Sequence, residues 1–371
     1  MRPKIAILGA GLMGRMLAVS LMEDYQVELF DRDCGDAKQS AAYLAAAMLA
    51  PLAESADCSK EIMQLGARAL QQWPDFLSKL TEPVFFQKKG SLVLAFEQDL
   101  GDLELFKSRL KGDEYELINS LEIKEIEPGV NARFNAGLLL PNEGQLDNRG
   151  LLLALSKTLK DSGVVWHKQA QVTRVTPAGE SPMYHCEGHE FSQFDWIFDC
   201  RGLGAKEDAM SDNQVNKPLA QLRGVRGEVI RLHAPNVTLS RPVRLMHPRY
   251  PIYIAPKEAG VFVVGATQIE SEDSRKPTVK SALELLSACF SVHRGFAEAE
   301  ILAIESGCRP AYWDNEPKIK VSGNIVSVNG LFRHGYLLAP VMVEQCLHLL
   351  KGTEKSSVVT KIMPLLMVKD G

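Results

Sequence analysis

The feature that most constrains the fold of this chain is a glycine-rich turn directly after a short apolar run near the N-terminus. Residues 5–8 read Ile-Ala-Ile-Leu, a continuous apolar run that is typical of a strand buried on both faces of a parallel sheet. Gly9, Gly11 and Gly14 follow, and residues 12–24 show the apolar spacing of a helix. A second apolar strand comes after this helix. The order predicts a strand–turn–helix–strand unit and therefore an α/β fold.

The same turn predicts a binding site for a dinucleotide. Gly9 allows the tight turn, Gly11 lets a pyrophosphate approach the backbone, and Gly14 lets helix and strand pack closely. The helix N-terminus presents free N–H groups and a partial positive charge to the phosphates. Asp31 closes the second strand, where its carboxylate can accept hydrogen bonds from ribose hydroxyls and would repel the 2′-phosphate of NADP. These residues alone leave both FAD and NAD open.

Composition and charge exclude several other classes of protein. Of the 371 residues, 46% are hydrophobic and 24% are charged, and the net charge of −4 gives no reason to expect nucleic acid. The seven cysteines are scattered without a CxxC pair, which indicates reduced thiols. The longest apolar run, residues 44–53, is too short to cross a membrane, and the N-terminus lacks the apolar centre of a signal peptide. We therefore expect a soluble, cytoplasmic protein.

The middle of the chain has a different pattern from the N-terminal unit. Residues 226–267 are nearly all β-like, with prolines and glycines between short β-branched runs. Helical periodicity occurs outside this region, at residues 149–160, 279–293 and 340–351, and a last apolar strand covers residues 325–328. So many consecutive strands fit poorly into one doubly wound sheet. We therefore predict a second, sheet-based domain inserted into the dinucleotide-binding domain.

No residue pattern indicates a catalytic nucleophile or a metal centre. The chain contains no GxSxG motif and no set of residues with the spacing of metal ligands. His185, Cys186 and His189 lie close together, but they fall in a short strand without a fourth ligand nearby. We therefore expect no bound metal.

A series of short segments resembles, in the same order, signatures of the D-amino-acid oxidase family of flavoproteins, and most closely its glycine oxidase branch. These segments are residues 41–51, 138–141, 147–151, 223–228, 253–256, 264–267, 307–310 and 332–340. The resemblance implies an α/β fold in which a Rossmann-like FAD-binding domain is interleaved with an antiparallel-sheet substrate domain. The first domain would take residues 1–80, 148–215 and 305–371, and the second would take residues 81–147 and 216–304.

The resemblance also implies which residues act on the substrate. Arg309 and Arg333 match arginines that contact the substrate carboxylate, a role that suits a planar guanidinium with two parallel hydrogen bonds. Tyr253 matches a substrate-contacting tyrosine. Two of these residues have a named structural alternative, namely an ion pair for Arg309 and packing between strands for Tyr253. Residues 335–340 and the helix after them would direct a helix N-terminus at the flavin N1–C2=O edge, where reduction places negative charge.

By the same resemblance, the cofactor is FAD. It would be held non-covalently, because Cys308 lies one position away from the cysteine that tethers the flavin in some relatives. Val172 matches the family's backbone contact to adenine. The expected cofactor contacts are Gly9, Gly11, Leu12, Met13, Gly14, Asp31, Arg32, Ala46, Ala47, Met48, Val172, Cys200, Gly202, Arg309, Arg333, His334, Gly335, Tyr336 and Leu337.

Several positions depart from the family pattern. Ala42 stands where a hydroxyl-bearing residue is usual, and Ala47 adds a Cβ where glycine is common. His334 replaces a frequent asparagine, and Leu331 replaces a frequent histidine. Residues 312–314, Tyr-Trp-Asp, place a bulky ring close after the expected carboxylate anchor. FAD binding tolerates these changes, whereas the identity of the substrate is left open.

Three functions remain open at this point. The first is an oxidase of glycine or another small amino acid or amine, with oxygen as acceptor and hydrogen peroxide as product; iminoacetate for thiamine thiazole synthesis is one use that the resemblance implies. The second is a dehydrogenase that feeds a quinone or a carrier protein; residues 358–368 could touch a membrane surface, although packing in the core is the favoured alternative for this segment. The third is a flavoprotein whose partner is another polypeptide. Each is compatible with a homo-oligomer.

Overall fold

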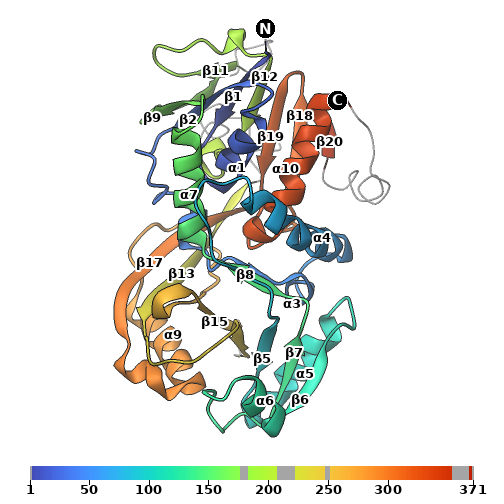
Figure 1. Ribbon diagram of the computed structural model, residues 1–371, viewed down its shortest axis with the longest axis vertical. Helices are drawn as coiled ribbons and strands as arrows, with labels where there is room; N and C mark the ends of the chain where they lie inside the picture. Colours follow the sequence, from blue (N-terminus) through green and yellow to red (C-terminus); the bar gives the residue numbers. More distant parts are fainter. Residues whose placement is uncertain (1, 176–182, 207–221, 247–250, 353–366, 370–371) are drawn as a thin grey trace.

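The computed structural model describes residues 2–175, 183–206, 222–246, 251–352 and 367–369. These residues form two large sheets that follow one another along the long axis of the molecule (Figure 1). The first sheet contains, in order, β20 (Met367–Lys369), β18 (Lys318–Ser322), β19 (Ile325–Asn329), β12 (Trp196–Asp199), β1 (Lys4–Leu8), β2 (Gln26–Asp31) and β9 (Val165–Lys168).

The N-terminal unit has the predicted order of strand, turn, helix and strand. β1 lies between β12 and β2, both parallel to it, so residues 5–8 are buried on both faces. Helices α1 (Leu12–Leu21), α7 (Asn148–Lys160) and α10 (Gly335–Lys351) pack together on one face. The hairpin of β10 (Thr173–Val175) and β11 (Met183–His185) joins a small core around Phe30 on the other face. The α/β class is confirmed.

The second sheet contains the β-rich region that the sequence predicts. Its order is β17 (Glu300–Ala311), β13 (Arg223–His233), β16 (Val261–Gly265), β15 (Ile252–Pro256), β14 (Val243–Leu245), β5 (Ser91–Leu94), β7 (Ala136–Leu140) and β6 (Glu116–Asn119). Neighbouring strands are antiparallel except β14 and β5. Helix α9 (Val279–Val292) covers one face, over Ile230, Ile254 and Val264. Because side chains alternate along a strand, the other face turns away from α9.

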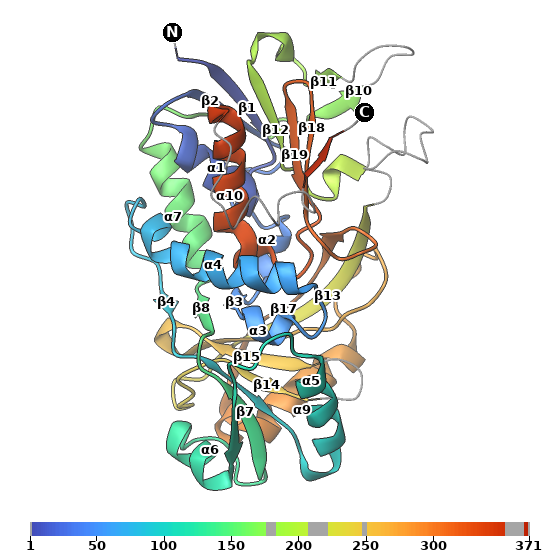
Figure 2. The same cartoon turned by 90° about the vertical axis from the view of Figure 1, so that its right-hand side faces the viewer.

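Short elements lie between the two sheets (Figure 2). A three-stranded sheet there has the order β3 (Met48–Leu49), β8 (Gly144–Leu146) and β4 (Phe86–Gln87). Helices α2 (Ala41–Leu44), α3 (Pro51–Glu54) and α4 (Lys60–Leu77) accompany it, while α5 (Leu100–Arg109) and α6 (Ser120–Ile126) flank the second sheet.

The last helix begins earlier than predicted. It starts at Gly335 rather than Pro340, so the proline lies inside α10 and not in its first turn. Proline has no N–H and leaves the carbonyl of the residue four positions earlier without its helical donor. That residue is Tyr336, and the indole N–H of Trp73 donates to its carbonyl at 3.1 Å. A side chain of α4 thus supplies the hydrogen bond that the sequence pattern of α10 lacks.

The domain boundaries predicted from the resemblance can be placed on these elements. The boundary at residue 305 falls inside β17, which pairs with β13 along residues 300–311. This part of the prediction needs correction, because residues 305–311 pair with β13 and therefore lie in the second sheet. The boundary between residues 215 and 216 lies outside the described residues.

The structure also bears on the expectations about membrane contact and about the cysteines. In the described part of the chain, no helix is both long and apolar enough to span a bilayer. Most of residues 358–368, the segment considered for a membrane surface, lie outside the described residues. All seven cysteines are unpaired.

Candidate cofactor and substrate site

A cavity of about 650 Å³ lies between the two sheets. The glycine-rich turn lines one end, and the face of the second sheet that turns away from α9 lines the other. Between them run residues 44–48 and the first turn of α10. The cavity therefore joins the predicted dinucleotide site to the predicted substrate residues.

The glycine-rich turn has the geometry that a bound pyrophosphate requires. Gly9 has a φ of +93°, which favours glycine, and a Cβ at Gly14 would lie 1.9 Å from the Gly9 carbonyl oxygen. Gly11 is the N-cap of α1, and within the described residues no side chain caps this helix and no acidic residue lies in its first turn. The free N–H groups therefore face the cavity, as phosphate binding needs. The residues present fit an adenine dinucleotide.

Asp31 stabilises this turn as well as lining the cavity. Its carboxylate accepts hydrogen bonds from the backbone N–H of Ala10 and, at 2.6 Å, from that of Asp33. A carboxylate has about four lone-pair sites, so acceptor capacity remains for ribose hydroxyls. Asp31 therefore connects the fold of the turn to the expected ribose contact.

The middle of the cavity is lined by Ala46, Ala47 and Met48, and the backbone at Ala47 is left-handed. Ala47 has a φ of +50°, the left-handed region in which glycine is favoured and which explains why glycine is common there in the family. The Ala47 carbonyl accepts a hydrogen bond from the Leu146 N–H at 3.1 Å. Pairing with β8 thus fixes the conformation despite the added Cβ.

The expected carboxylate anchor lies on the second sheet. Arg309 on β17 and Tyr253 on β15 both line the cavity, and burial lowers the pKa of Arg309 and raises that of Tyr253. Gly227 on β13 makes room for the arginine, because a Cβ there would lie 2.3 Å from Arg309 Nη2. Gly265 on β16 does the same for the tyrosine, with 2.8 Å to its hydroxyl oxygen. Two glycines therefore form the floor on which the predicted substrate residues lie.

Arg333 belongs to an ion-pair cluster that the sequence did not predict. Its Nη2 lies 3.2 Å from Glu54 Oε1, and the Nη2 of Arg244 donates to the same oxygen at 2.7 Å. A weaker contact of 3.3 Å joins Arg333 to Asp57. Burial favours the neutral form of Glu54, but the two arginines outweigh it and hold the pKa of the carboxyl well below its usual range. Glu54 therefore positions Arg333 at the cavity wall.

The model for the family of FAD-dependent oxidoreductases matches residues 4–345. The chain belongs to this family. The resemblance to D-amino-acid oxidases and glycine oxidases is confirmed, and the cofactor of this family is FAD.

Named relatives and solved structures agree with this assignment. A protein of Rhizobium etli named as a thiamine biosynthesis oxidoreductase is 36% identical over 342 residues, which cover 91% of this chain and 94% of that protein. The crystal structure of glycine oxidase from Geobacillus kaustophilus has a TM-score of 0.82 at 21% identity, covering 97% of this chain and 98% of that one. Iminodiacetate oxidase from Chelativorans sp. BNC1 has a TM-score of 0.80 at 22% identity, covering 98% and 99%.

In this FAD-dependent oxidoreductase, α10 directs its N-terminus into the cavity. Gly335 and Tyr336 line the cavity, and the N-cap residue His334 provides no side-chain cap in the described structure. The ring of His334 is 2% exposed, and burial lowers its pKa to about 4, so it is neutral at physiological pH. Its Nδ1 lies 3.7 Å from Glu54 Oε2. The uncapped helix N-terminus suits the negative charge of a reduced flavin.

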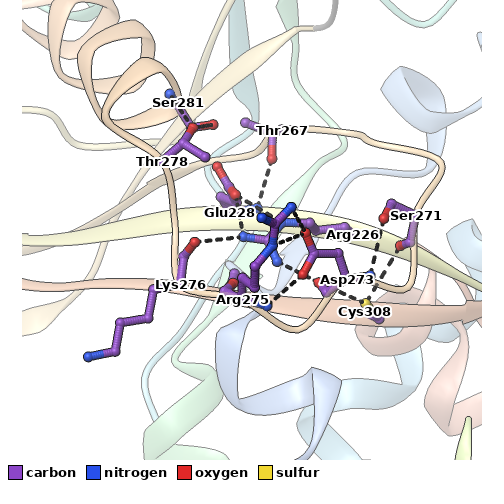
Figure 3. A network of polar contacts seen from close by, with 11 residues as sticks. Arg226, Glu228, Thr267, Ser271, Asp273, Arg275, Lys276, Thr278, Ser281 and Cys308 are labelled. Atoms are coloured by element: carbon purple, nitrogen blue, oxygen red, sulfur yellow. Dashed lines mark hydrogen bonds and ion pairs between the residues drawn. The ribbon is translucent and has the colours of Figure 1, made fainter.

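Cys308 points its thiol into a loop of the second sheet. The sulfur lies 3.7 Å from the Ser271 carbonyl oxygen and 3.9 Å from that of Asp273 (Figure 3). The side chain of Arg226 holds the same loop, donating to the carbonyls of Asp273 and Lys276. Burial raises the pKa of the Cys308 thiol, so it is a poor nucleophile for a flavin.

The structure brings together nearly all residues predicted for the site. Those that line the cavity are Gly9, Gly11, Leu12, Met13, Asp31, Arg32, Ala46, Ala47, Met48, Val172, Cys200, Gly202, Tyr253, Arg309, Arg333, Gly335 and Tyr336. Gly14, His334 and Leu337 lie behind the lining, in contact with the turn, with Glu54 and with Gly66, respectively. The Val172 carbonyl oxygen accepts a hydrogen bond from Arg201 Nη1 at 2.8 Å.

Sequence reasoning missed Glu54, Arg244 and the role of Gly227. Glu54 follows the cavity-lining residues 44–48 as one acidic residue in an apolar stretch, and an isolated charge of this kind is a detectable signal of a buried pair. Arg244 and Gly227 carry no comparable local signal. Their roles follow from the register of the second sheet.

Proposed function

We propose that this enzyme oxidises the C–N bond of glycine or another small amino acid, with oxygen as the final acceptor and hydrogen peroxide as product. The observation that carries the proposal is that Arg309 lacks an ion-pair partner among the described residues. Its guanidinium lines the cavity, yet among the described residues no carboxylate lies within ion-pair distance, and its hydrogen bond to the Thr267 carbonyl is long at 3.4 Å. A charged group in such a setting calls for an anion. The carboxylate of an amino acid supplies one.

Each neighbouring side chain has a defined task in this proposal. Arg309 binds the carboxylate with two parallel hydrogen bonds, which fix the angle of the α-carbon as well as its distance. Tyr253, whose raised pKa keeps it protonated, donates its hydroxyl hydrogen to the same carboxylate. Arg333 adds positive charge at the cavity wall while Glu54 limits its movement. When bound, FAD supplies the hydride acceptor.

Two of the comparisons support the substrate class. The neighbours named glycine oxidase and iminodiacetate oxidase share the fold over nearly the whole chain, and both names denote oxidation of an amine that carries a carboxylate. One relative is named for thiamine biosynthesis. On that basis, we infer that the imine product could enter a biosynthetic step. The Cys308 thiol donates to loop carbonyls and its pKa is raised, which supports non-covalent FAD that acid would release.

An anaerobic panel tests the proposal. The holoenzyme is mixed with glycine, sarcosine, D-alanine, D-proline or iminodiacetate, and bleaching of the flavin absorbance is recorded. We expect reduction by at least one of them, followed by rapid reoxidation and peroxide formation when air enters. Reduction with slow reoxidation in air would indicate a dehydrogenase instead. If no small amine reduces the flavin, the amino-acid proposal is wrong and a polypeptide substrate becomes the better hypothesis.

A further inference from the structure

Lys257 is a buried lysine that does not line the cavity. It follows β15 at the junction of the two sheets, and the residue is 8% exposed. Its Nζ donates to the carbonyls of Ala46 and Leu146, each at 2.8 Å, and to Gln145 Oε1 at 3.1 Å. An ammonium group has three donors and no acceptor. The three oxygens therefore match a protonated lysine.

These acceptors belong to the segment that faces the flavin and to the strand behind it. Ala46 and Met48 line the cavity, and β8 pairs with β3, with Gln145 opposite Met48. Lys257 holds the peptide before Ala47, and the Leu146 N–H holds the peptide after it. The left-handed residue of this segment is thus fixed on both sides, once from the second sheet and once from β8.

The charge of Lys257 is costly to bury, and no carboxylate is among its hydrogen-bond partners. Burial lowers the pKa of Lys257 to about 7; of the charged groups that face it, Asp147 raises the pKa and Arg231 lowers it. A neutral amine can donate only two hydrogen bonds. Deprotonation near neutral pH would therefore remove one of the three contacts that hold the segment.

We propose that Lys257 is a positioning residue whose ammonium group holds the Ala46–Met48 segment in the shape that receives FAD. The inference rests on the cofactor and not on the proposed substrate, so a failed amino-acid panel would leave it intact. Its consequence is that FAD binds more tightly when Lys257 is protonated.

Dilution of the holoenzyme, with the fluorescence of released FAD as readout, tests this between about pH 6 and pH 9. For the wild type, we expect the dissociation constant of FAD to rise about tenfold across this range as one charge-assisted hydrogen bond is lost. The variant Lys257→Met should bind FAD at least about tenfold more weakly at the lower pH and show no dependence on pH. Lys320→Met is the matched control, because Lys320 is a buried lysine of β18 outside the cavity lining. Its FAD affinity should equal that of the wild type.

A general loss of stability would not produce weaker FAD binding at higher pH. The pKa of Lys257 is lower in the folded chain than its ordinary 10.5, so the unfolded chain binds more protons above pH 7 and this group makes the fold more stable as pH rises. A flat wild-type profile would overturn the proposal without any variant. So would a Lys257→Met protein that keeps wild-type affinity or keeps the pH dependence.

Discussion

The guanidinium of Arg309 occupies the space that a side chain on Gly227 would need, because a Cβ at Gly227 would lie 2.3 Å from Arg309 Nη2. The two residues lie on adjacent strands, β17 and β13. Gly227→Ala should therefore push the guanidinium out of position while leaving the cofactor end of the cavity unchanged. We expect kcat/KM for the amino acid to fall about a hundredfold, since small misplacements of a positioning group have effects of this size.

The matched control is Gly163→Ala, because a Cβ at Gly163 has no heavy atom within 4 Å. Steady-state kinetics and the flavin content of both purified variants provide the measurement. Unchanged kinetics in Gly227→Ala would show that Arg309 can move without consequence and does not anchor the substrate.

Arg309→Met removes the charge and keeps a side chain of similar length. A hydrogen bond to a charged group is worth about 1.5–3 kcal/mol, so loss of a two-pronged anchor should slow flavin reduction at subsaturating substrate by about a hundredfold or more. FAD content should stay near that of the wild type. Anaerobic stopped-flow absorbance measures both the rate of flavin reduction and the FAD content of the purified variant. Loss of FAD together with activity would instead mean that Arg309 serves mainly to hold the cofactor.

Glu54→Gln should destabilise the protein in a pH-dependent way. The substitution leaves Arg244, which is 3% exposed, and Arg333 without their shared carboxylate, and removal of one partner from a buried pair costs about 3 kcal/mol. The folded chain holds the pKa of Glu54 below its ordinary 4.5, so this stabilisation is complete above about pH 4.5 and is lost as the pH falls further. Urea unfolding of wild type and variant should differ most at neutral pH and converge in acid. An equal gap at every pH would contradict this assignment.

Ala47→Gly should stabilise the Ala46–Met48 segment that lines the cavity. A left-handed conformation costs an alanine roughly 1 kcal/mol, and glycine adopts it without that cost. We expect a higher melting temperature for the holoenzyme and FAD affinity at least equal to that of the wild type. Ala45→Gly is the control, because Ala45 has a φ of −64° and gains nothing from glycine. A lower melting temperature in Ala47→Gly would mean that the Cβ contributes packing that outweighs the backbone cost.

Local features of the chain were predictable from the residues because they depend on neighbours in sequence. The glycine-rich turn, β1, α1 and the acidic end of β2 form one short unit whose geometry follows from glycine's missing Cβ and from apolar periodicity. The β-rich middle was predictable for the same reason. The start of α10 was predicted too late, because Pro340 breaks the local pattern and Trp73, far away on α4, repairs it.

The sequence by itself determined that this chain binds a dinucleotide and, through its ordered family signatures, that Arg309, Tyr253 and Arg333 belong to one site. Only the tertiary structure decided what supports them. Glu54 and Arg244 are 190 positions apart in sequence, yet they share a hydrogen bond. Such pairs depend on strand register and on how a helix packs against a sheet, which no short window of residues encodes.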